Sequence, residues 1–119
     1  DYVNAHGTST PEGDPIEIHA LQQVFGTHAG RLAVSATKSM HGHLLGAAGA
    51  IEALATVLSL REQAIPPTAH LAGRLDPACA GVDHVLEGRR GVRVRAALSN
   101  SFAFGGSNAV LAFRQAPLH

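Results

Sequence analysis

The 119-residue sequence has no tryptophan, a single cysteine and few aromatic side chains of any kind. The lone thiol of Cys79 excludes an internal disulfide framework and fits a reducing compartment, so we expect a cytoplasmic protein. The opening residues do not have the basic and then apolar pattern of a secretory signal peptide. Nine basic and nine acidic side chains cancel, which removes the electrostatic reason to expect nucleic acid or an anionic membrane as partner.

The sequence also has no long apolar run free of charge. The longest apolar stretch, residues 44–60, carries Glu52 near its middle. Its length is at the short edge of the roughly 17–25 residues that a spanning helix needs. A charge at mid-bilayer costs a few kcal/mol, so we expect a buried core helix and no membrane span. The chain length allows one domain at most.

The first half of the chain predicts two strands and two helices. Residues 2–5 are typical of a short strand that ends at His6, and residues 31–38 of a second strand. Asp14 is expected as the N-cap of a helix that Gly26 ends, with Glu17 in a capping-box position. Its buried stripe is expected to be Ile18, Leu21 and Phe25. An alanine-rich helix is expected over residues 44–62.

The second half predicts a hairpin. Residues 71–91 are irregular, with scattered proline, glycine and charge. Residues 92–102 and 108–114 alternate like strands around a glycine turn, which indicates a hairpin. The order strand–helix–strand–helix–strand–strand implies an α/β sheet covered by helices.

Four polar features follow predicted strands or precede predicted helices: the His6 loop, Lys38, the pair His41 and His43, and the turn at residues 105–106. Ligands of open α/β sheets bind outside the carboxyl ends of the strands, so these features are expected to converge on one pocket. His43 is expected at or near the N-terminus of the long helix, where the positive end of the helix favours a neutral imidazole. Such an imidazole can donate one hydrogen bond to a developing oxyanion.

Each feature also has a structural interpretation. His6 can be a structural loop residue, Lys38 a solvated lysine, and Glu17 a helix cap. The hydroxyls of residues 8–10 can satisfy loop backbone. The "HGH" spacing invites a zinc site but lacks a third ligand at a typical spacing, so no metal site is expected. Cys79 is not placed like a nucleophile, and the glycine turn is not a phosphate loop.

Three segments together are more specific than any one of them: "VNAHGTSTPEGDPIE", "SATKSMHGHLLGAAGAIEA" and "LSNSFAFGGSNAVLAF". In this order and spacing they resemble the C-terminal half of the β-ketoacyl-acyl carrier protein (ACP) synthases, and among these the 3-oxoacyl-ACP synthase II type. The resemblance implies a thiolase-like α-β-α layered fold, of which residues 1–119 are a partial C-terminal half, and a homodimer in the full-length protein.

The resemblance also implies site residues. His6 and His43 match two catalytic histidines, Lys38 the active-site lysine, and Phe104 a gating residue whose backbone N–H helps to form an oxyanion hole. The remaining matches bind substrate or support the site. Thr8 and Thr10 match threonines that hydrogen-bond the phosphopantetheine arm, and Gly105 and Gly106 in the glycine turn are also expected to bind substrate. Glu17, as a structural partner of Lys38 in the polar network, and Asn108 are expected to support the site. His41 is assigned no catalytic role.

The implied reaction is a decarboxylative Claisen condensation of malonyl-ACP with an acyl thioester, in fatty acid or polyketide synthesis. The implied partner is ACP, whose phosphopantetheine arm carries the substrates, and no further cofactor is expected. The family's nucleophilic cysteine lies in an N-terminal half that residues 1–119 do not include, so this chain alone is expected to be inactive. Two alternatives stay open: a chain-length-factor-like partner subunit and a decarboxylating loading synthase.

Overall fold

The computed structural model describes residues 1–116 and contains a five-stranded mixed sheet of order β4-β2-β1-β6-β7. Neighbouring strands are parallel from β4 to β6, whereas β7 runs antiparallel to β6. The strands are β1 (Tyr2–Asn4), β2 (Ala33–Ser35), β4 (Asp83–His84), β6 (Ala96–Ala103) and β7 (Ser107–Arg114). The long β6–β7 pair confirms the expected hairpin, and its turn is a short 3₁₀ segment, η4 (Phe104–Gly106).

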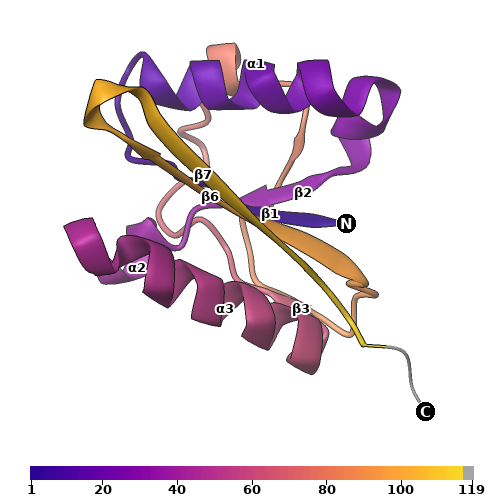
Figure 1. Cartoon of the computed structure of the whole chain (residues 1–119). Coiled ribbons are helices and arrows are strands. Elements are labelled where there is room, and N and C mark those ends of the chain that lie inside the picture. Colours follow the sequence, from indigo (N-terminus) through magenta and orange to yellow (C-terminus); the bar gives the residue numbers. More distant parts are fainter. Residues whose placement is uncertain (117–119) are drawn as a thin grey trace.

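Helices cover both faces of the sheet, as expected for the α-β-α layering. Figure 1 shows α1 (Gly13–Phe25) on one face and α3 (Ala48–Glu62) on the other, with the short α2 (Lys38–His41) on the α3 side. Short 3₁₀ segments, η1 (Gly26–Arg31) and η2 (Leu45–Ala47), follow α1 and precede α3. Across the described residues, every helix falls short of the length and apolarity that a membrane crossing requires.

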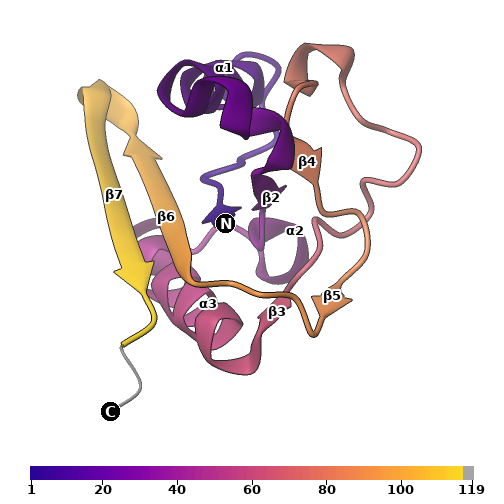
Figure 2. The ribbon, with the colours of Figure 1, turned by 90° about the vertical axis from the view of Figure 1, so that its right-hand side faces the viewer.

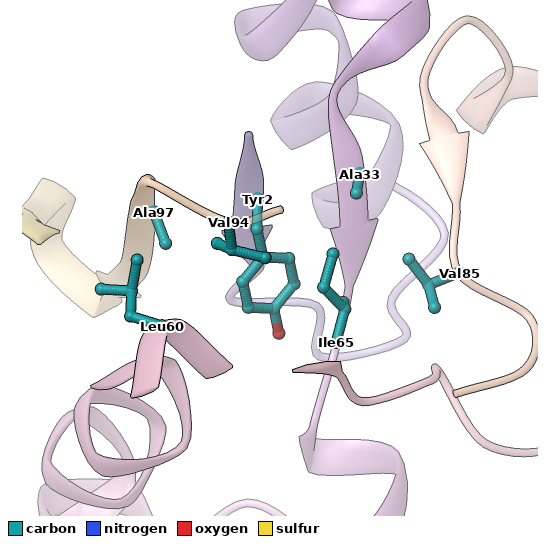
Figure 3. Close-up of a cluster of buried hydrophobic side chains, with 7 residues drawn as sticks. All are labelled: Tyr2, Ala33, Leu60, Ile65, Val85, Val94 and Ala97. Atoms are coloured by element: carbon teal, nitrogen blue, oxygen red, sulfur yellow. The ribbon is translucent and has the colours of Figure 1, made fainter. Parts of the chain in front are cut away.

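Successive residues of β1, the central strand, pack into two separate hydrophobic clusters, because side chains of a strand alternate between the faces of the sheet. Tyr2 belongs to the cluster on the α3 side, which Figure 3 shows around its ring, and Val3 belongs to the cluster beneath α1. Both residues are almost completely buried. The first cluster comprises Tyr2, Ala33, Leu60, Ile65, Val85, Val94 and Ala97. The second comprises Val3, Ala5, Ile18, Leu21, Leu32, Val34 and Cys79.

The predicted first helix is correct in extent but not in its cap. Ile18 and Leu21 are buried, Phe25 packs against the same cluster, and Gly26 ends α1 with a φ of 53°. Asp14, however, lies inside the helix and is not its N-cap. Its carboxylate accepts a hydrogen bond from the Ser9 N–H at 3.1 Å, so it binds the preceding loop instead of the helix start.

The helix expected over residues 44–62, observed as α3, is less buried than expected. Its sheet-facing side carries small and polar residues such as Ala48, Thr56 and Ser59, whereas Leu54 and Val57 are exposed. The prediction of a core helix is therefore right for one face of α3 and wrong for the other.

The first three expected strands begin or end beyond the observed ones, and three short strands were missed. The second strand spans only β2, because the chain turns into α2 at Lys38. Strand β6 begins at Ala96 because Val92 and Val94 bond to Gln63 instead of joining the ladder. The segment 71–91 contains β4 and β5 (Arg89–Arg90), and β5 pairs with β3 (Ala64–Ile65). Figure 2 shows β4 and β5 on the opposite side of the molecule from the β6–β7 hairpin.

Candidate active site

The carboxyl ends of two adjacent parallel strands bring His6, Lys38 and His43 together. His6 follows β1, Lys38 follows β2, and His43 lies in the loop between α2 and α3. The Lys38 ammonium donates to the His6 carbonyl oxygen at 2.7 Å and lies 3.4 Å from His6 Nδ1. The two imidazole rings are 5.7 Å apart between centroids and nearly perpendicular. His6, Lys38 and His43 therefore converge as expected, whereas His41 and the glycine turn do not join them.

Hydrogen bonds around the two rings define where each imidazole carries its proton. The Leu45 N–H donates to His43 Nδ1 at 3.1 Å, which leaves the ring proton on Nε2. The Lys38 ammonium likewise faces Nδ1 of His6, so this nitrogen is an acceptor and Nε2 a donor. Burial lowers the pKa of His6 from its ordinary value, and the charge of Lys38 lowers it further. His6 is thus a neutral hydrogen-bond donor through Nε2.

His43 lies close to the start of the long helical segment but outside it. His43 lies in the loop that precedes the 3₁₀ segment η2, and α3 begins only at Ala48. The backbone N–H of Leu45, the first residue of η2, donates to the ring and orients it.

A buried carboxylate holds the His6 loop. Glu17 is only 4% exposed, and its two oxygens accept the backbone N–H groups of His6 at 2.9 Å and Gly7 at 3.0 Å. The side-chain amide of Asn100 donates to the same carboxylate at 2.9 Å. The capping-box interpretation of Glu17 is therefore wrong, since its carboxylate faces the loop and not the start of α1. Asn100 did not stand out in the sequence.

The resemblance implied Glu17 as the polar partner of Lys38, but Lys38 pairs with Glu52 instead. The Lys38 ammonium contacts a Glu52 carboxylate oxygen, and both side chains are almost fully buried. Glu52 was considered in the sequence only as a charge that argues against a membrane helix. The missed signal was this charge within an apolar helix, because a buried charge requires a partner.

The His6 loop passes too close to Ala36, the residue after β2, for any side chain at Gly7. Gly7 has a φ of 43°, and a Cβ there would lie 2.5 Å from the Cβ of Ala36. We expect Gly7→Ala to lower the free energy of unfolding by about 2–4 kcal/mol, from backbone strain and overpacking. Chemical denaturation measures this change. Gly30→Ala is the matched control, because no atom lies near its Cβ position and its φ is not in the left-handed region. Equal stabilities of the two variants would contradict the prediction.

A cavity of about 650 Å³ opens beside this loop. Thr8 and Thr10 line it together with Lys38 and His43. The Thr10 hydroxyl accepts the Gly13 N–H at 3.0 Å, and its own proton stays available as a donor. The far wall of the cavity comes from the segment 68–76.

The glycine turn is not part of this cavity lining. Phe104 is fully exposed at the end of the β6–β7 hairpin, beside Gly105 and Gly106, whose φ angles of 80° and 79° favour glycine. Asn108 is exposed on β7, opposite Phe102. Phe102, which was not singled out in the sequence, instead packs on the His6 ring, with centroids 5.6 Å apart.

His41 and Cys79 stand apart from the site chemistry. The ring nitrogens of His41 lie 2.8 Å from the Gly42 carbonyl and 3.1 Å from the Thr37 hydroxyl, so the ring is held within its own turn. Cys79 is buried in the cluster beneath α1, and this burial raises the pKa of its thiol. No group of three metal-ligating side chains comes together within residues 1–116.

Comparisons with known proteins show the family of the chain. Residues 1–72 match the family described as beta-ketoacyl synthase, C-terminal domain. The chain belongs to the beta-ketoacyl synthase family. It is 53% identical over 114 residues to 3-oxoacyl-[acyl-carrier-protein] synthase 2 of Synechocystis, covering 96% of this chain and 27% of that protein. The chain therefore spans about a quarter of the length of this curated relative.

Solved structures show the same fold. The crystal structure of a beta-ketoacyl synthase from Burkholderia phymatum superposes with a TM-score of 0.87 at 43% identity, over 98% of this chain and 28% of that one. A type II polyketide ketosynthase, solved with its acyl-carrier protein and bound to the hexaketide, gives a TM-score of 0.89 at 34% identity, over 97% and 28%. The fold is thus the thiolase-like fold of ketosynthases, represented here by its C-terminal portion.

Proposed function

We propose that this chain is the C-terminal part of a 3-oxoacyl-ACP synthase that condenses malonyl-ACP with an acyl thioester. One observation carries the proposal: His6 and His43 are adjacent imidazoles, each with Nδ1 facing a donor and Nε2–H left to donate. Two such donors suit the oxygen of a thioester enolate, because preorganised N–H groups stabilise charge that develops in the transition state.

In the proposed reaction, malonyl-ACP loses carbon dioxide as the bond between the carboxylate and the methylene carbon breaks. The electron pair of that bond moves into an enolate, whose oxygen accepts hydrogen bonds from His6 and His43. The enolate carbon then attacks an acyl thioester held on a cysteine of the enzyme other than the buried Cys79. The new carbon–carbon bond forms and the cysteine leaves as a thiolate.

The other residues support this chemistry in the proposal. Lys38 holds the His6 ring through its contacts with His6 and Glu52. The hydroxyls of Thr8 and Thr10 bind the phosphopantetheine arm of ACP. The Phe104 N–H contributes to the oxyanion hole of the acyl thioester, with Gly105, Gly106 and Asn108 shaping the turn.

The proposed partners are ACP and the rest of the synthase, which assembles as a homodimer in the cytoplasm. A related ketosynthase has been solved in complex with its acyl-carrier protein, which supports ACP as partner here. The substrates arrive on the ACP arm, and the reaction requires no metal or nucleotide. The presence of both histidines with Lys38 argues against a chain-length-factor-like subunit.

Purified full-length enzyme that contains this chain tests the proposal. We expect it to decarboxylate malonyl-ACP and to join the product to an acyl group; decarboxylation without condensation would indicate a loading synthase instead. Absence of both reactions would contradict the proposal.

The pH dependence of decarboxylation follows from the environment of His6. The pKa of His6 lies below its ordinary value of 6.5, so the ring stays neutral as the pH falls through that value. Protonation of Nδ1 would face the Lys38 ammonium and disrupt their contact. We expect the loss of rate that follows protonation of His6 to occur at this lowered pKa, below pH 6.5. A pH–rate profile and an NMR titration of the His6 ring measure the two quantities. An acid limb at or above pH 6.5 that follows His6 would contradict the prediction.

A further inference from the structure

The carboxylate that holds the His6 loop is itself held by one strand of the hairpin. Glu17 makes no ion pair with any of residues 1–116, although its side chain is buried. Its charge is stabilised by three hydrogen-bond donors. Two of them are the backbone N–H groups of the loop that Glu17 positions. The third, the side-chain amide of Asn100, is the one donor from a different part of the fold.

Asn100 is well placed to act as a fixed anchor. It lies on β6, is only 3% exposed, and follows Ser99, which pairs with Asn4 of the central strand β1. Strand β6 is bonded on both sides, to β1 and to β7. A donor on such a strand has little freedom to move, so it restricts the carboxylate that accepts from it.

We propose that Asn100 is a positioning residue for His6. Asn100 Nδ2 and the His6 N–H donate to the same oxygen of Glu17, and the Gly7 N–H donates to the other. Through Glu17, Asn100 thereby fixes the position of the His6 backbone relative to β6. The position of the Nε2–H donor is fixed with it. The inference rests on the proposed function, because it assigns Asn100 to the reaction in which His6 stabilises the enolate.

The decisive variant is Asn100→Asp, which preserves shape but exchanges the amide donor for a carboxyl group. At about pH 8 the new carboxylate cannot donate and repels Glu17, so the decarboxylation rate falls about 10–100-fold below wild type through misplacement of His6. Toward about pH 6, two adjacent carboxyl groups share one proton, and a protonated carboxyl donates to Glu17 as the amide does. The ratio of variant to wild-type kcat is therefore expected to rise several-fold as the pH falls. The KM for malonyl-ACP stays unchanged.

Other titrating groups do not produce this change in the ratio. The groups near Glu17 are His6 on the β1 loop and Asp14 on α1, with Lys38 on α2 and Glu52 on α3 behind His6. All of them are present in both proteins. Gln23→Glu is the matched control, since it makes the same amide-to-carboxyl exchange at an exposed position of α1. The ratio of its kcat to that of wild type is expected to stay constant with pH.

Amide hydrogen exchange tests the inference without activity. In Asn100→Ala the protection of the His6 and Gly7 N–H groups is expected to fall, whereas that of the Ala5 N–H, which bonds to the Ser35 carbonyl, is retained. Circular dichroism confirms that each variant is folded.

The outcomes separate the inference from the proposed function. A wild-type enzyme without decarboxylase activity overturns the proposed function and the catalytic role of Asn100 with it. An active wild type with a pH-independent ratio for folded Asn100→Asp overturns the positioning role alone. Unchanged protection of His6 and Gly7 in Asn100→Ala overturns the positioning role in either case.

Discussion

His6→Ala and His43→Ala are each expected to lower kcat for malonyl-ACP decarboxylation about 10²–10³-fold, the usual cost of losing one preorganised donor to an oxyanion. The rings lie 5.7 Å apart, and hydrogen bonds at Nδ1 leave Nε2–H of each as the donor. These contacts strengthen only as charge develops, so kcat falls while the KM for malonyl-ACP changes little. Release of carbon dioxide from malonyl-ACP measures the effect.

The double variant and a nearby histidine serve as controls. The two rings act on one oxygen, so the double variant is expected to lose less than the product of the single losses. His41→Ala is expected to leave the rate within about threefold of wild type, since its ring bonds to its own turn and surface substitutions of this kind have small effects. Single variants with wild-type kcat would refute the roles assigned to His6 and His43.

The second large effect concerns stability. Glu52→Gln is expected to lower the free energy of unfolding by about 3–5 kcal/mol, because it leaves the buried Lys38 ammonium without its counter-charge. The two side chains are 5% and 1% exposed, so water cannot compensate for the lost partner. Denaturant unfolding, with equal m-values for the two proteins, measures the change.

The same helix offers a matched control. Glu62 pairs with Arg61 at the exposed end of α3, where the side chains are 56% and 70% exposed. Glu62→Gln is expected to change stability by less than about 1 kcal/mol, because surface ion pairs contribute little. A Glu52→Gln effect no larger than that of Glu62→Gln would contradict the burial argument.

Removing both charges tests the same argument from the other side. Glu52 Oε2 is buried without a hydrogen-bond partner among residues 1–116, so the pair is not fully compensated. Lys38→Met combined with Glu52→Met is therefore expected to be more stable than Glu52→Gln alone. The double variant still lacks the Lys38 ammonium that holds His6. We therefore expect it to be more stable than Glu52→Gln without high decarboxylation activity.

The parts of the fold that could be predicted from the sequence are those with a local signal. The apolar spacing of Ile18 and Leu21 predicted α1, and Gly26 ends it as expected. The alternation around the glycine turn predicted the β6–β7 hairpin. Strands of two residues, such as β4 and β5, have too few side chains to show any period, so only their pairing partners reveal them.

By itself the sequence determined the family and the residues at the strand ends. His6, Lys38 and His43 stand in two recognisable segments, and the parallel sheet brings all three residues to one edge. Tertiary structure alone decided which polar groups pair inside. From the sequence, Lys38 could have formed an ion pair with Glu17 or with Glu52, and Glu17 could have capped its own helix. The packing of α3 buried the Glu52 carboxylate beside the Lys38 ammonium, and the packing of α1 buried the Glu17 carboxylate beside the His6 loop and Asn100. A buried charge binds the donors that lie within reach, and the spacing of residues in the sequence does not reveal which donors those are.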